Sequence, residues 1–165
     1  MYNISIPIST SSLNLIREDM LKKEEILKTL ELLSGILGNN VKWIVGASSA
    51  LFVHGLDILP NDIDIIIDIK DYDKAISLLK ESLPTDTSYI KEKQKITFEI
   101  SQVSVDLLAF DISSNDIEYK NIGSTTIPVN SLQNELLFYK QRTDKKDASQ
   151  RKISLIEEEL SRKNF

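Results

Sequence analysis

The stretch "VGASSALFVHGLDILPNDIDIIID", Val45 to Asp68, decides the fold. Asp62 and Asp64 stand at the start of a run of isoleucines, and a glycine followed by serines comes shortly before them. Such an apolar run predicts a strand in the centre of a sheet that is covered on both faces. A buried strand tolerates carboxylates only if their charge is compensated, and a bound metal ion is the compensation that we expect.

The periodicity of apolar residues around this stretch predicts an α/β (α+β) chain with a small mixed sheet flanked by helices. We expect helices over 12–37, 48–54 and 71–83, and strands over 41–45, 62–69, 95–100, 103–110, 118–122 and 125–129. A helical tail should follow, with Asn130 as its N-cap and Gln133 three residues later. The expected domain is a single one over 1–165, with a core of about 12–129 and a tail of about 130–163.

Composition excludes several classes of protein. The chain has 165 residues, a net charge of −5 and no cysteine, which rules out disulfide frameworks and thiolate metal sites. The charge argues against nonspecific binding of duplex DNA, although a basic run over 140–152 is typical of a solvated helix face. Neither a secretory signal nor a membrane-spanning stretch is visible, so we expect a cytoplasmic protein.

The acids of the strand can converge on one ion. Side chains alternate along a strand, so Asp62 and Asp64 point to the same face, roughly 6.6 Å apart along the chain. In "VSVDLLAF", Asp106 lies on the face opposite Val103 and Val105, and would complete a cluster if the two strands pair. Three carboxylates repel one another without cations. They suit Mg²⁺, with Mn²⁺ as an alternative, and two such ions can clamp a phosphoryl displacement.

The glycine turn suits a phosphate. Gly46 allows a ligand to approach the backbone closely, and Ser48 and Ser49 offer hydroxyls at the start of the next helix. A phosphate-binding turn beside a carboxylate cluster predicts a site for a metal–nucleotide complex.

These motifs together resemble the nucleotidyltransferase superfamily, typified by DNA polymerase β and its small single-domain prokaryotic relatives. The family pattern of strand, glycine pair, short helix, Asp-x-Asp strand and later acid matches Gly46, Asp62, Asp64 and Asp106. The tail "IPVNSLQNELLFYKQRTDKKDASQRKI" is similar to that of the small relatives, so the resemblance covers about 41–153. The segment "HGLDILPNDIDI" resembles antibiotic-type nucleotidyltransferases and the toxins of toxin–antitoxin and abortive-infection modules.

The resemblance implies a reaction. A nucleoside triphosphate would bind with Mg²⁺ held by Asp62, Asp64 and Asp106, and an acceptor hydroxyl would attack the α-phosphate and release pyrophosphate. Asp106 would also help to deprotonate that hydroxyl, and Lys140 would reach the triphosphate. The acceptor is a small molecule, an RNA end or a protein, and the resemblance allows a protein partner or a homo-oligomer.

Two other functions stay open on the sequence. Ala47 replaces the second residue of the glycine pair, and Ile58 and Pro60 replace an arginine and a threonine of the family. These departures are consistent with a catalytically inactive member that binds or regulates a partner in a two-gene module. The third reading is a glycosyltransferase that uses Asp-x-Asp with a sugar nucleotide, but the glycine turn lies on the wrong side of the acids.

Overall fold

The structure is a computed structural model that describes residues 9–142 and 146–164. The first eight residues, where a secretory signal would begin, and residues 143–145 of the basic run lie outside the described residues. Within the described residues, none of the helices combines the length and the apolar character that crossing a membrane requires.

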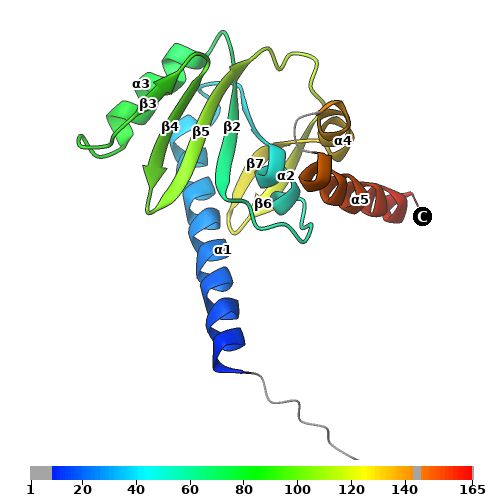
Figure 1. Ribbon diagram of the computed structural model, residues 1–165. Helices are drawn as coiled ribbons and strands as arrows, with labels where there is room; N and C mark the ends of the chain where they lie inside the picture. Colours follow the sequence, from blue (N-terminus) through cyan, green and yellow to red (C-terminus); the bar gives the residue numbers. More distant parts are fainter. Residues whose placement is uncertain (1–8, 143–145, 165) are drawn as a thin grey trace, which may run out of the picture.

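One mixed sheet of seven strands forms the centre of the fold (Figure 1). Its strands follow the order β3-β4-β5-β2-β1-β7-β6, in which β2 pairs with β5, and β1 with β7, in parallel. The strands are β1 (Trp43–Gly46), β2 (Asp62–Asp68), β3 (Ile90–Glu92), β4 (Lys95–Ile100), β5 (Val103–Phe110), β6 (Ile117–Ile122) and β7 (Thr125–Asn130). The predicted α/β class is confirmed, and β2 is the central strand.

Five helices flank the sheet: α1 (Thr10–Leu37), α2 (Ala47–Val53), α3 (Tyr72–Ser82), α4 (Leu132–Gln141) and α5 (Lys146–Lys163). The C-terminal half of α1 and the helix α3 pack on one face, where Leu30, Leu33 and Leu79 join the isoleucines of β2 in the main core. A second, smaller core joins α2, α4 and α5 through Leu51, Leu132, Tyr139 and Ile156. The N-terminal half of α1 projects away from the body (Figure 1).

The two faces of β2 differ, which corrects the expectation that both would be covered. Ile63, Ile65 and Ile67 are fully buried against the helices, as alternation requires. Asp62, Asp64 and Ile66 point to the other face, remain partly exposed and line a pocket. The strand is therefore central in the sheet, but its acidic face is open to a ligand.

Local predictions hold, with two differences. The hairpin of β4 and β5 turns over Ser101 and Gln102, whose φ angles of 50° and 67° are those of the turn that a twisted two-residue hairpin prefers. The strand β3, which is short and exposed, gave no pattern in the sequence. The N-cap of α4 is Ser131, whose hydroxyl accepts from the backbone N–H of Asn134. The prediction that Asn130 is this cap was wrong, because Asn130 still belongs to β7.

Candidate functional site

The structure brings together the three acids that the sequence singled out. Asp64 on β2 stands directly beside Asp106 on β5 in the parallel register, and Asp62 lies two residues before Asp64 on the same face. One carboxylate oxygen from each lies within 4.8 Å of the others. Three carboxylates at this spacing form a donor set that fits a hard divalent cation such as Mg²⁺.

The carboxylates of this cluster disfavour one another's negative charge. Burial, followed by the neighbouring charges of Asp62 and Asp106, raises the pKa of Asp64 from 3.8 to about 7. Asp106 is only 8 % exposed, accepts a hydrogen bond from the hydroxyl of Thr97, and lies 3.3 Å from the Lys95 ammonium. The nearby Asp106 in turn raises the pKa of Lys95. Lys95 therefore offsets part of the negative charge at the Asp106 end of the cluster.

The glycine turn lies beside this cluster at the end of β1. A Cβ on Gly46 would come within 2.6 Å of Cδ1 of Ile66, so glycine leaves the room that this side chain occupies. Ala47, which follows, has a φ of 53° in the left-handed region. Its backbone N–H donates to Oε1 of Glu135 at 3.0 Å, and Asn130 donates to the same oxygen at 2.8 Å. A buried carboxylate of α4 thus holds the turn in this strained conformation.

Ala47→Gly is expected to raise the free energy of unfolding by about 0.5–1 kcal/mol. It removes a left-handed strain of about 1–2 kcal/mol, and the greater freedom of glycine in the unfolded chain offsets part of this gain. Urea unfolding measures the change. The matched control Ala50→Gly, in the same helix but without positive φ, should instead lower the stability by about 1 kcal/mol or more. Equal losses in the two variants would show that Ala47 is not strained.

The two serines that follow have different surroundings. The hydroxyl of Ser49 is fully buried, accepts from the backbone N–H of Asp64 and donates to the backbone carbonyl of Asp62, both at 3.0 Å. It fixes the start of β2, and with it the two acids. Ser48 lines the pocket, and its hydroxyl lies 2.7 Å from the ammonium of Lys152. Of the two, Ser48 is the one placed to meet a ligand.

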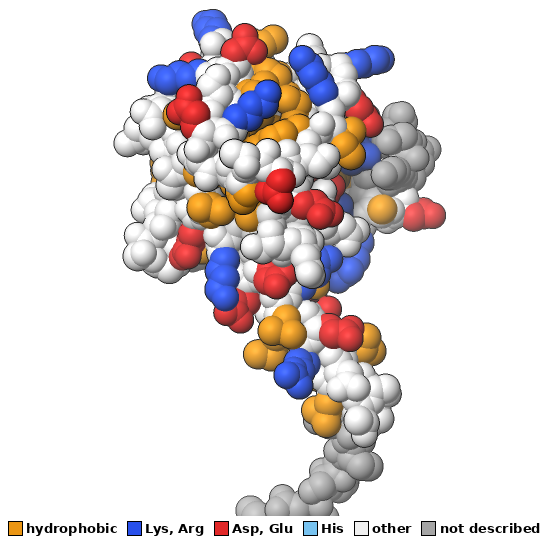
Figure 2. Space-filling model, turned by 90° about the vertical axis from the view of Figure 1, so that its left-hand side faces the viewer, with side chains coloured by type: hydrophobic (Ala, Val, Ile, Leu, Met, Phe, Trp, Pro, Cys, Tyr) orange, Lys and Arg blue, Asp and Glu red, His pale blue; other side chains and the backbone are white. Residues whose placement is uncertain are grey.

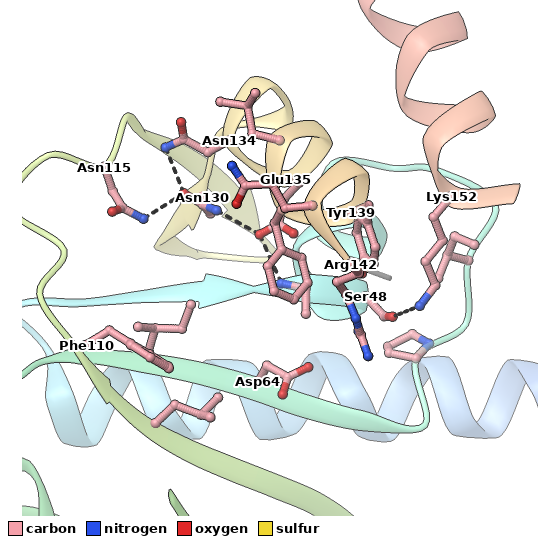
Figure 3. A pocket seen from close by; sticks show the side chains of 18 of the residues that line it. Ser48, Asp64, Phe110, Asn115, Asn130, Asn134, Glu135, Tyr139, Arg142 and Lys152 are labelled. Atoms are coloured by element: carbon pink, nitrogen blue, oxygen red, sulfur yellow. Dashed lines mark hydrogen bonds between the residues drawn. The ribbon is translucent and has the colours of Figure 1, made fainter. Parts of the chain in front are cut away.

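The basic residues that line the pocket do not include Lys140, the lysine expected from the sequence. The ammonium of Lys140 lies 2.7 Å from the carboxylate of Glu157, and Lys140 is not among the described residues that line the pocket. Arg142, Arg151 and Lys152 line it instead. Figure 3 shows Arg142 and Lys152 directed toward the turn at Ser48, beside Asp64. Lys152 also lies 5.0 Å from the ring centre of Tyr139.

The pocket has a volume of about 950 Å³ and joins these features. Its floor carries Asp62 and Asp64, and the cationic side chains described above line one side. Leu108, Phe110 and Phe138 add apolar surface to the lining, and the ring centre of Phe138 lies 5.5 Å from the guanidinium of Arg142. A pocket with acids, bases and apolar surface suits a ligand that combines a metal-bound anion with a ring system.

The pocket also contains Glu135 and the basic residues Arg142, Arg151 and Lys152, none of which the sequence singled out as site residues. Glu135 is 1 % exposed, and its second oxygen has no hydrogen-bond partner among the described residues. Burial raises its pKa from 4.5 to about 7. A signal for Glu135 existed, because it falls on the buried stripe of α4 with Leu132 and Tyr139. No comparable signal existed for Lys152, which lies in a generally basic segment.

Comparison with known proteins supports the same fold. No family model matches the sequence, and no curated protein matches it either. Among solved structures, an antigenic nucleotidyltransferase-like protein from Paracoccidioides brasiliensis has a TM-score of 0.60 and 17 % identity, over 81 % of this chain and 75 % of its own. A proposed nucleotidyltransferase from Thermotoga maritima has a TM-score of 0.54 and 17 % identity. The match covers 94 % of this chain and 99 % of that protein.

A third similar structure is the lincosamide antibiotic adenylyltransferase LnuA with lincomycin bound. Its TM-score is 0.55 and its identity 15 %, over 81 % of this chain and 95 % of that protein. At such identities the likeness concerns the fold. The described chain has the fold of the nucleotidyltransferase superfamily.

Proposed function

We propose that the chain is a single-domain, metal-dependent nucleotidyltransferase that moves a nucleoside monophosphate from a nucleoside triphosphate to an acceptor hydroxyl. The observation that carries the proposal is the cluster of Asp62, Asp64 and Asp106 at a pocket beside the Gly46 turn. A set of repelling acids at a ligand-sized pocket is what a cation-dependent reaction needs. The likeness in fold between this chain and nucleotidyltransferases supports the same reaction class.

The three acids have separate parts in this proposal. Asp62 and Asp64 line the pocket and would hold Mg²⁺ where it meets the phosphates. Asp106 is nearly buried and bonded to Thr97 and Lys95, so we assign it to the metal and not to the proton of the acceptor. Bound Mg²⁺ would neutralise charge that develops on the phosphates. The acceptor oxygen bonds to the α-phosphorus, the bond to the β-phosphate breaks, pyrophosphate leaves, and water takes the proton.

The polyphosphate would lie between the acids and the cationic side of the pocket. Ser48 and Lys152 offer a hydroxyl and an ammonium that already lie 2.7 Å apart, and Arg142 approaches the same place. The N–H of Ala47 is taken by Glu135, so side chains and not this N–H must bind the anion. The pocket would hold the flat, uncharged part of the substrates against Phe110 and Phe138.

Lys152→Met should weaken the binding of a nucleoside triphosphate by roughly tenfold or more, because a charge-assisted hydrogen bond contributes about 1.5–3 kcal/mol. Calorimetric titration with Mg²⁺ present measures the affinity. Lys140→Met is the matched control, since it removes the same charge from a residue that pairs with Glu157 outside the pocket. Equal losses in the two variants would contradict the assignment of Lys152.

Transfer itself is tested with nucleoside triphosphates labelled at the α-phosphate. The protein, Mg²⁺ and each triphosphate are incubated with separated small-molecule, RNA and protein fractions of a bacterial extract. The proposal expects label in one fraction together with release of pyrophosphate, and neither product with the Asp64→Asn variant. Release without dependence on the acids would contradict the proposed site.

A second function is favoured by two contacts. Glu135 accepts from the N–H of Ala47 in the glycine turn, and Lys95 pairs with Asp106 of the carboxylate cluster at 3.3 Å. Protein groups therefore already bind part of the turn and part of the cluster. A chain that binds a nucleotide without turning it over, as a regulatory partner, would fit these contacts. Saturable binding of a triphosphate, with no labelled product from any fraction, would favour this function over transfer.

A further inference from the structure

The N-terminal half of α1 is a free-standing helix. Every residue from Thr10 to Leu21 is exposed, a length of about 18 Å, and Figure 1 shows this end projecting from the body. Isolated helices of this length are marginal in water. Apolar side chains are nevertheless interleaved with charged ones along it (Figure 2). Such a segment gains stability when another helix covers its apolar stripe.

Four of the exposed apolar residues of α1 form one stripe, and Leu15, Leu21 and Leu32 are exposed on other sides of the helix. Leu13, Ile16, Met20 and Leu27 are 51 %, 52 %, 65 % and 36 % exposed. With Lys23 they follow the alternating spacing of three and four residues that places side chains along one seam between paired helices. The buried stripe of Ile26, Leu30, Leu33 and Leu37 faces the sheet. The exposed stripe is rotated by about a quarter of a turn from it, so a second helix can approach without displacing the core.

The charges beside the stripe specify the occupant. Arg17 and Glu24 lie on one flank of the stripe, and Asp19 lies on the other. In an antiparallel pair of identical helices the same flanks face each other. Arg17 of each chain then meets the partner's Glu24, which gives two equivalent contacts. In a parallel pair opposite flanks meet, and Asp19 would face the partner's Glu24. The charges therefore attract in the first arrangement and repel in the second.

We propose that the protein forms a homodimer in which the N-terminal halves of two α1 helices pair antiparallel through this stripe. Ile16 then packs against the partner's Leu27, and Met20 packs beside the stem of the partner's Lys23. Lys23 keeps its ammonium near the partner's Asp19. Glu24 already lies 2.7 Å from Lys28 of its own helix, an exposed contact that does not prevent it from reaching the partner's Arg17. This inference is independent of the reaction at the pocket.

The test is the molar mass in solution as a function of protein concentration, by sedimentation equilibrium. The wild-type chain should dimerise. Arg17→Glu and Glu24→Arg should each raise the dissociation constant roughly tenfold or more, because each turns two attractive contacts into repulsive ones. Glu18→Arg, on the side of α1 opposite the stripe, is the matched control and should leave it unchanged. Circular dichroism confirms that the variants keep their helices.

Mixing the two variants decides the orientation. Arg17→Glu and Glu24→Arg chains combined in equal amounts should form a heterodimer, because each acid again meets a base. A tighter dimer of Glu24→Arg alone would overturn the antiparallel arrangement in favour of a parallel one. A wild-type chain that stays monomeric at every concentration would overturn the proposal altogether.

Discussion

Asp64→Asn is expected to abolish nucleotidyl transfer and, at the same time, to stabilise the metal-free protein. The amide keeps the shape of the side chain but removes the charge that would hold the metal. Because the metal supplies several kcal/mol of charge stabilisation in such reactions, the rate should fall by roughly 10³-fold or more. The opposite effect on stability arises because burial and the charges of Asp62 and Asp106 raise the pKa of Asp64 and so disfavour its ionised form.

The size of the stability gain follows from the pKa of Asp64. Burial and its acidic neighbours raise this pKa from 3.8 to about 7, so at pH 8 the folded chain holds a carboxylate in an unfavourable place. Since the residue is partly exposed, we discount the full value and expect a gain of about 1–3 kcal/mol at pH 8 without metal. Thermal unfolding in chelator measures the gain, and pyrophosphate release measures the activity.

Asp111→Asn is the matched control for this variant. Asp111 also lines the pocket, but it is exposed and accepts from the backbone N–H of Ser113 in its own loop, which an asparagine oxygen can do as well. Activity and stability should both stay close to the wild type. If Asp64→Asn turned over normally, or if it destabilised the metal-free chain, the cluster could not be a cation site of the kind proposed.

The second large effect is on the pH dependence of stability. Glu135 and Asp64 each have a folded pKa of about 7, against ordinary values of 4.5 and 3.8. Between these limits the folded state holds protons that the unfolded state has released, so the free energy of unfolding falls as the pH rises. The fully buried Glu135 can contribute up to ~3 kcal/mol to this fall. His54 has the opposite effect on stability. Burial lowers the pKa of its imidazole below 6.5, so its contribution to the free energy of unfolding rises as the pH rises toward 6.5.

Urea unfolding of the metal-free protein at pH 5, 6, 7 and 8 tests this balance. We expect the highest stability near pH 5 and a steady loss up to pH 8, since the two carboxyls outweigh one imidazole. Glu135→Gln keeps an oxygen for the N–H of Ala47 and for Asn130 but cannot ionise, so the fall above pH 5 should become shallower and leave mainly the contribution of Asp64. A stability that rises between pH 5 and 8 in the wild type would contradict both carboxyl assignments.

The acidic half of the site was predictable because its rules are local. Alternation along a strand places Asp62 and Asp64 on one face, and the same alternation places Asp106 opposite Val105. Only the pairing of β2 with β5 had to be assumed, and the apolar character of both strands made that assumption reasonable. The long flanking helices followed from the same periodic patterns, whereas the order of the strands in the sheet did not.

The basic half was not predictable because it depends on long-range packing. Glu135 reaches Ala47 across 88 residues of sequence, and Lys152 reaches Ser48 across 104. Which face of α4 and α5 meets the pocket is decided by the small core around Leu51 and Tyr139, which no local spacing reveals. For this reason the sequence points to Lys140, whereas in the structure Lys152 is the lysine beside Ser48. The incorrect cap at Asn130 differs by one residue, which is the usual precision of a helix boundary.

The central claim is that the acids and the pocket form one site for a metal–nucleotide complex. The most direct measurement is a calorimetric titration of each of the four nucleoside triphosphates into the folded protein, with Mg²⁺ and with chelator. The Asp62→Ala/Asp64→Ala variant is titrated alongside. The account predicts binding that requires both Mg²⁺ and the two acids. Binding that survives in chelator or in the variant, or no binding of any triphosphate to the folded wild type, would contradict it.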